Sequence, residues 1–155
     1  MKIRTRMATV AMMTAAAVVS ALSHAQSPEL RTERNLLSSI NDARRSQGIP
    51  PLRWNESLAA AARHHAAIMA EHRSARHAFA SEPGLSARVK QTGAHFSWLS
   101  ENVTEGPNSE FIHAQFMHSP SHRANILDID MNSIGIGVVE RNGQFYAVED
   151  FAQVH

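Results

Sequence analysis

The chain has 155 residues, no cysteine and a formal net charge of +1 at pH 7. Disulfide bonds are therefore excluded, and the small net charge with scattered Lys and Arg gives no support for binding to nucleic acid or to a membrane surface. The 10 histidines are many for this length. Because imidazole is the commonest metal ligand in proteins and titrates near neutral pH, these residues direct attention to metal sites.

The first 25 residues have the pattern of a secretory signal peptide. Lys2, Arg4 and Arg6 precede an apolar run over residues 7–22, and residues 23–25 (Ser-His-Ala) form a small-x-small triplet suited to signal peptidase. A transmembrane anchor is the alternative, but the run is shorter than the ~20 apolar residues that a spanning helix needs. Cleavage after Ala25 predicts a periplasmic or secreted protein without an integral membrane segment.

Subtracting these 25 residues from 155 leaves 130, enough for a single domain with a hydrophobic core. Two helices are predicted in its N-terminal half. Apolar residues recur at helical spacing over residues 28–47, and Gly48 and two prolines end the pattern. Residues 59–71 are rich in alanine, the strongest helix former, and Asn55 is a suitable N-cap. Residues 74–107 are loop-rich, with one short helix over residues 85–91.

The C-terminal half predicts one more helix and a β-hairpin. Helical periodicity returns over residues 108–118, and residues 119–127 form a polar turn before the chain re-enters the core. Residues 133–140 and 144–151 are rich in β-formers and flank Asn142-Gly143, the signal for a tight hairpin turn. Helices followed by strands predict an α+β domain in which helices cover an antiparallel sheet.

Three distant residues combine the chemistry of a small metal site. His77, Glu101 and His122 offer two imidazoles and one carboxylate, the donor set of many zinc sites with an open position. They lack the short spacing of a zinc motif, and the chain has no HExxH sequence. Turn or loop histidines and a hydrogen-bonded buried carboxylate are therefore the structural alternative.

The order of several motifs resembles that of the CAP superfamily, the domain of cysteine-rich secretory proteins, antigen 5 and plant pathogenesis-related 1 proteins, and most of all its short bacterial cysteine-free members. The resemblance runs from about Leu36 to Phe151. The motifs that carry it are residues 41–44 (Asn-Asp-Ala-Arg), 51–54 (Pro-Leu-Arg-Trp), 100–103 (Ser-Glu-Asn-Val), 119–127 (Ser-Pro-Ser-His-Arg-Ala-Asn-Ile-Leu) and 134–137 (Ile-Gly-Ile-Gly).

This resemblance implies an α-β-α sandwich with a central antiparallel sheet flanked by helices. It also implies a cavity lined by two histidines and acidic residues, which holds a divalent cation such as Zn²⁺ in some members. His77, Glu101 and His122 occupy the matching positions. Three polar neighbours are expected to support the cavity: Asn102, Ser119 and Asn125.

The chain departs from the family pattern near the expected fourth ligand. Animal and plant members have a second glutamate there, whereas this chain offers Met117 and His118, and neither Glu110 nor Glu149 is favoured as a substitute. Two milder departures are Ser100 in place of a glycine and Phe116 in place of a tryptophan.

The resemblance favours a monomeric, non-catalytic binding module for a small hydrophobic or envelope-derived ligand, with no organic cofactor. A metal-dependent hydrolase acting on an envelope or extracellular substrate is the alternative, with Glu101 as a ligand or as general base to a bound water. A third hypothesis makes Ser119 a nucleophile with His122 as its base, but the chain has no Gly-x-Ser-x-Gly motif.

Overall fold

The computed structural model describes residues 27–155, so the predicted signal peptide lies outside the described residues. None of the helices in this part of the chain is long and apolar enough to cross a membrane. The elements in chain order are α1 (Pro28–Ser46), β1 (Arg53–Trp54), α2 (Glu56–His72), α3 (Leu85–Gln91), β2 (Phe96–Gly106), α4 (Ser109–His118), α5 (Pro120–Ile126), β3 (Ser133–Arg141) and β4 (Gln144–Val154).

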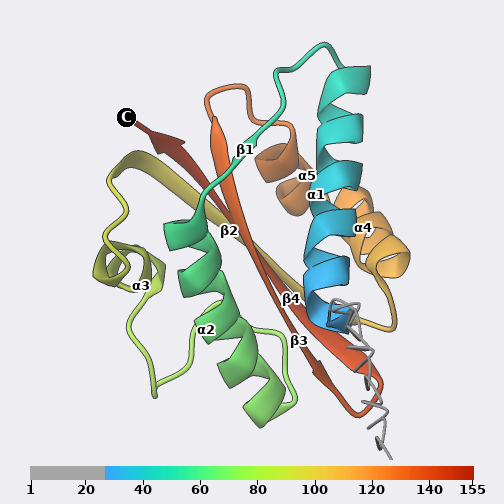
Figure 1. Ribbon diagram of the computed structural model, residues 1–155, viewed down its shortest axis with the longest axis vertical. Helices are drawn as coiled ribbons and strands as arrows, with labels where there is room; N and C mark the ends of the chain where they lie inside the picture. The colour runs from blue at the N-terminus through green and yellow to red at the C-terminus, as the bar shows by residue number, and fades with distance from the viewer. Residues whose placement is uncertain (1–26) are drawn as a thin grey trace, which may run out of the picture.

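The elements form three layers, with the sheet between two groups of helices (Figure 1). The strand order is β1-β3-β4-β2. Helices α2 and α3 cover one face, and α1, α4 and α5 cover the other. The α+β class and the sandwich architecture are confirmed, but the sheet is not wholly antiparallel, because β1 pairs parallel with β3. These two strands are far apart in sequence, so no hairpin fixes their relative direction.

The predicted helix starts are confirmed by side-chain caps. The Asn55 carboxamide oxygen accepts a hydrogen bond from the Leu58 amide at 3.0 Å, and that of Asn108 accepts one from Phe111 at 2.8 Å. The Ser27 hydroxyl caps α1 in the same way at 3.3 Å. Each cap satisfies an amide that the first helical turn leaves without a partner.

Two glycines in β3 let α2 lie directly on the sheet. A Cβ atom added to Gly135 would lie 2.0 Å from the Ala59 amide nitrogen, and one added to Gly137 would lie 2.1 Å from that of Arg63. Neither contact is sterically allowed, so only glycine fits at these two positions. The alanine-rich sequence of α2 and the Ile-Gly-Ile-Gly sequence of β3 are therefore two halves of one packing arrangement.

The predicted hairpin is also confirmed. Strands β3 and β4 pair from Arg141↔Gln144 inward, with Asn142 and Gly143 as the two turn residues. Both have positive φ angles, 54° and 78°, as a type I′ turn requires. This turn fixes the register that places Asp150 opposite Gly135 and Glu149 opposite Ile136.

Besides the two-residue β1, which was not predicted, two elements differ from the sequence prediction. Strand β2 occupies residues 96–106, within the segment predicted to be loop-rich, and α5 replaces the predicted turn at residues 119–127. Periodicity did not reveal β2 because the residues at its centre, Glu101 and Asn102, are polar although both are buried, one on each face of the sheet. The strand therefore lacks the alternation of apolar and polar residues that identifies a half-buried strand. Pro120 at the first position of α5 looks like a turn residue in the sequence but is well suited to start a helix.

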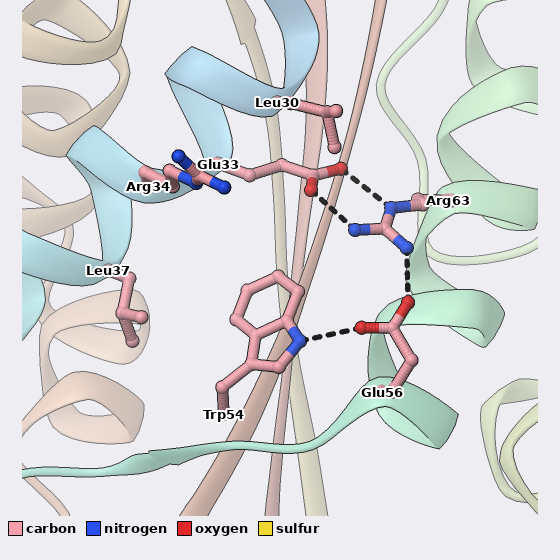
Figure 2. Close-up of a pocket in the computed structure, with 7 residues that line it drawn as sticks. All are labelled: Leu30, Glu33, Arg34, Leu37, Trp54, Glu56 and Arg63. Atoms are coloured by element: carbon pink, nitrogen blue, oxygen red, sulfur yellow. Dashed lines mark hydrogen bonds and ion pairs between the residues drawn. The ribbon is translucent and has the colours of Figure 1, made fainter. Parts of the chain in front are cut away.

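An ion-pair network joins α1 to α2 (Figure 2). Arg63 donates to both oxygens of the buried Glu33, at 2.9 and 2.7 Å, and to Glu56 at 2.6 Å. Glu56 also accepts from the Trp54 indole at 2.8 Å. These groups line a hollow of about 310 Å³. Because Arg63 binds both carboxylates, we interpret this hollow as part of the packing interface between α1 and α2 rather than as a binding site.

Candidate functional site

The candidate site lies at β2, an edge strand of the sheet, and uses both of its faces. Glu101 and Asn102 are neighbours in β2, so their side chains point to opposite faces. Glu101 is in register with Asp150 on the face covered by α2 and α3. Asn102 is in register with Glu149 on the face covered by α4 and α5.

Glu101 binds two cationic or potentially cationic side chains. His77 Nδ1 lies 2.9 Å from Glu101 Oε1, and since a carboxylate only accepts hydrogen bonds, Nδ1 is the protonated nitrogen. Arg88, almost completely buried in α3, donates to the other oxygen, Oε2. Both oxygens of the carboxylate are thereby held in place. Because Nδ1 of His77 is occupied by Glu101, Nε2 is the ring nitrogen of His77 that could bind a metal ion.

Behind Glu101 lies a buried group of ionisable side chains from α2, α3, β4 and the loop after α2. His65 is fully buried, with Nε2 2.8 Å from the Arg76 carbonyl oxygen and Nδ1 2.6 Å from Glu82 Oε1. The second contact has ion-pair distance but not the alignment of a good hydrogen bond. Arg88 reaches the same carboxylate at 3.8 Å, so one guanidinium lies between Glu82 and Glu101.

Asp150, also buried, completes this group, and its surroundings favour the protonated acid. Burial raises the pKa of Asp150 well above its ordinary value, and the nearby Glu101 carboxylate raises it further, while Arg88 partly opposes the change. A protonated Asp150 avoids a third negative charge beside Glu82 and Glu101. Arg88 thus contacts both buried carboxylates, and His65 and His77 lie 2.6 and 2.9 Å from them, so neither carboxylate is buried without a partner.

On the opposite face, two asparagines hold the helix that carries His122. Asn102 Nδ2 donates to the His122 carbonyl oxygen at 3.1 Å and to Glu149 Oε2 at 3.1 Å. Asn125 Nδ2 donates to Asn102 Oδ1 at 2.9 Å. Burial raises the pKa of Glu149 to about 8. These contacts place Asn102 and Asn125 as supports of α5, and Glu149 behind them rather than beside the imidazoles.

The two candidate histidines face each other from different elements. Their ring centres are 6.4 Å apart, and the His122 ring also packs edge-to-face on Phe116 at 5.2 Å. The pKa of His77 is raised, chiefly by its hydrogen bond with Glu101, whereas burial and the nearby His77 lower the pKa of His122. His122 therefore presents a neutral imidazole at neutral pH, the form that binds metals.

Among residues 27–155, no group of three or more His, Cys, Asp or Glu side chains is arranged to hold a metal ion. Glu101 lies against His77 and Arg88, which suits an outer-shell carboxylate that orients a ligating histidine. With tetrahedral coordination and zinc–nitrogen distances of about 2.0–2.1 Å, two imidazoles on one ion have ring centres about 5–5.5 Å apart. The ring centres of His77 and His122, 6.4 Å apart, are about 1 Å too far apart for this geometry, so the two imidazoles have suitable donor chemistry but must move closer together to share one ion.

The sequence-based site residues thus have three different positions. His77, Glu101 and His122 come together at the edge of β2, and Asn102 and Asn125 lie beneath them. Ser119 precedes α5 and its hydroxyl lies 3.3 Å from Ser121 Oγ. The sequence reasoning missed four members of the buried group: His65, Glu82, Arg88 and Asp150. The adjacent acids Glu149 and Asp150 in the middle of a largely apolar strand sequence were a local signal for Asp150.

A family model described as the cysteine-rich secretory protein family, CAP, matches residues 37–151 of this chain. The Bacillus subtilis (strain 168) protein YkwD is 28% identical over 109 residues, 70% of this chain. The match covers 42% of YkwD, so this chain corresponds to less than half the length of that relative.

Solved structures show the same fold. An extracellular protein with an SCP domain from Bacillus anthracis str. Ames superposes with a TM-score of 0.75 at 20% identity, over 81% of this chain and 41% of that protein. An outer surface protein from Borrelia burgdorferi gives 0.74 at 19% identity, over 81% of this chain and 94% of that one. With the family model spanning most of its length and no cysteine in its sequence, this chain belongs to the cysteine-rich secretory protein (CAP) family as a cysteine-free member.

Proposed function

We propose that this chain is an extracytoplasmic, non-catalytic binding module in which His77 and His122 bind a divalent cation, with Zn²⁺ as the candidate. The observation that carries the proposal is the contact between His77 Nδ1 and Glu101 Oε1 at 2.9 Å, opposite the His122 ring. A carboxylate on the far nitrogen fixes the tautomer and orientation of a ligating histidine. The signal-peptide pattern and the neighbours described as extracellular and outer surface proteins support the location.

The same contacts argue for binding rather than hydrolysis. A general base must be within reach of the water that it deprotonates, but both Glu101 oxygens already bind His77 and Arg88. Glu101 therefore suits the positioning of His77 better than proton abstraction. The ligand we expect is a small hydrophobic or envelope-derived molecule that contacts the bound cation or the exposed edge of His77.

Calorimetric titration of the protein lacking residues 1–25 with Zn²⁺ tests this proposal. His77→Ala and His122→Ala should each weaken binding by at least about tenfold, the effect of losing a ligand or its support. His64→Ala is the matched control, because His64 is exposed on α2 and should not change the affinity. Zinc binding of parental strength in both site variants would overturn the proposal, and turnover of ester, peptide or phosphodiester substrates by the zinc-loaded protein would favour the hydrolase.

A further inference from the structure

Strand β2 begins and β4 ends at the same end of the sheet (Figure 1). A second hollow lies there. It has a volume of about 530 Å³ and is lined by Ser97, Trp98, Asp128, Asp130 and Gln153. This volume is in the range of ~300–1,000 Å³ typical of small-ligand sites. None of these five residues belongs to the His77–Glu101–His122 site.

A β-bulge turns Trp98 toward this hollow. Phe96 is in register with Val154 and Trp98 with Gln153, so Ser97 is an extra residue in β2. Side chains alternate along a regular strand, yet Phe96 and Leu99, three positions apart, pack against the same buried cluster. The extra residue makes this arrangement possible and leaves Trp98 on the other face, 61% exposed. A large exposed indole next to a hollow is unusual, because tryptophan is highly buried on average.

The polar groups of the hollow are fixed before any ligand binds. Ser97 Oγ donates to Gln153 Oε1 at 2.7 Å. The carboxamide oxygen of Gln153 is thereby held by Ser97, and its NH₂ group points away from Ser97 and can donate to a ligand. Asp128 Oδ1 accepts from the Asp130 amide at 2.9 Å. Asn132 then joins this loop to the end of β4, accepting from the Val154 amide at 3.0 Å and donating to its carbonyl oxygen at 2.8 Å.

Buried Arg44 of α1 holds the same loop from below. Its guanidinium donates to the carbonyl oxygens of Ile126 and Asp128, both at 2.8 Å, and to those of Met131 at 3.1 Å and Pro50 at 2.8 Å. Several bonds to carbonyls from one side chain fix the backbone that carries Asp128 and Asp130. Binding then costs little loop entropy, which is the advantage of a preorganised site.

We propose that this hollow is a carbohydrate-binding site for neutral or amino-sugar-containing glycans. A pyranose ring has an apolar C–H face, which stacks on an exposed indole, and hydroxyl groups that both donate and accept hydrogen bonds. The hollow offers acceptors on Asp128 and Asp130 and donors on the Gln153 amide, so both hydroxyl roles can be satisfied. The two carboxylates repel uronic acids and other anionic sugars.

The apolar surface here is too small for a protein partner. The large exposed apolar side chains here are Trp98 of β2 and Ile129 of the loop that carries Asp128 and Asp130. Two side chains offer much less surface than the about 800 Å² that each partner buries in a stable protein interface. A simple cation site is also less suitable, because a cation needs acceptors only and would not use the Gln153 amide. The proposal does not depend on the cation at His77 and His122.

Calorimetry with three probes, chitotetraose, its fully deacetylated form and tetragalacturonate, tests the proposal on the protein lacking residues 1–25. The first or second should bind with a Kd of about 1 mM or tighter, and tetragalacturonate should not. Trp98→Ala should weaken binding by about tenfold or more, the size of one good stacking contact, and Trp98→Phe by less. Phe111→Ala removes an exposed aromatic side chain on α4 and is the matched control.

The binding should persist in EDTA and in His77→Ala, which separates this site from the proposed cation site. Because Trp98 is exposed, Trp98→Ala should keep the parental unfolding midpoint, so a loss of binding can be assigned to the lost contact. Failure of both neutral and amino-sugar probes to bind, equal binding by tetragalacturonate, or parental affinity in Trp98→Ala would each overturn the proposal. Binding of spermidine without binding of either saccharide would replace it with a cation site.

Discussion

His77 and Glu101 are in contact, with Nδ1 of the imidazole 2.9 Å from Oε1 of the carboxylate. The first residue comes from the loop after α2 and the second from the centre of an edge strand. Arg88 binds the other carboxylate oxygen, which fixes the orientation of the Glu101 side chain. The imidazole of His77 is therefore positioned by a carboxylate that is itself held in place. The contact with Glu101 raises the pKa of His77, whereas burial and then the nearby His77 lower the pKa of His122.

We expect His77 to titrate above about 6.5 and His122 below it, because the carboxylate stabilises imidazolium at His77 while burial and the charge of His77 disfavour it at His122. Glu101→Gln removes the negative charge and should lower the pKa of His77. NMR titration of the imidazole resonances measures both values. Zinc should consequently bind less tightly as the pH falls through the pKa of His77. An unchanged His77 pKa in Glu101→Gln would contradict this interpretation.

Glu149 should make the protein less stable as the pH rises from about 4.5 to about 8. Its pKa is raised in the folded state, so the folded protein binds the proton more tightly than the unfolded chain. This contribution to the free energy of unfolding is present below the unfolded pKa and is lost as the pH rises through the folded one, by up to about 5 kcal/mol. Urea unfolding of parent and Glu149→Gln across this range measures it. The variant should lack this part of the slope, and parallel profiles would show that Glu149 does not cause it.

Arg88→Met should destabilise the protein by about 3–5 kcal/mol, because it leaves the buried carboxylates of Glu82 and Glu101 without their shared cation. The matched control is Arg31→Met on the exposed face of α1, where we expect a change within about 0.5 kcal/mol. Denaturant unfolding at pH 7 measures both. A cost below about 1 kcal/mol for Arg88→Met would mean that the buried charges are balanced in another way.

Gly137→Ala should cost about 3 kcal/mol or more, because its Cβ would lie 2.1 Å from the Arg63 backbone and α2 would have to move off the sheet. Gly84→Ala is the control, since a Cβ there meets nothing within 4 Å and its φ of −64° suits alanine. Thermal unfolding and soluble yield distinguish the two. Equal stability of the two variants would show that α2 does not depend on this close contact.

The parts of the fold that sequence could predict were those with local causes. Asn55 and Asn108 cap helices through contacts three residues away, and Asn142-Gly143 determines its own turn. Strand β2 has no such signal, because it owes its polar centre to partners distant in the sequence. Glu101 is acceptable there only because Arg88 and His77 reach it.

The candidate site shows the same limit. Motif order identified His77, Glu101 and His122, and the structure brings them together. Motif order could not reveal that Glu101 is bound by Arg88, nor that His65 and Asp150 lie behind it, because these residues from separate elements meet only on the sheet face covered by α2 and α3. The difference between a three-ligand site and a two-histidine site supported by a carboxylate therefore depends on tertiary structure.

The most direct test of the central claim is a crystal structure of the protein soaked with Zn²⁺ at a pH above the pKa of His77. We expect zinc about 2.0–2.1 Å from one ring nitrogen of His77 and one of His122, with Glu101 still bound to His77 Nδ1 and to Arg88. Zinc coordinated directly by a Glu101 oxygen, or zinc absent from the two imidazoles while bound elsewhere, would contradict the account.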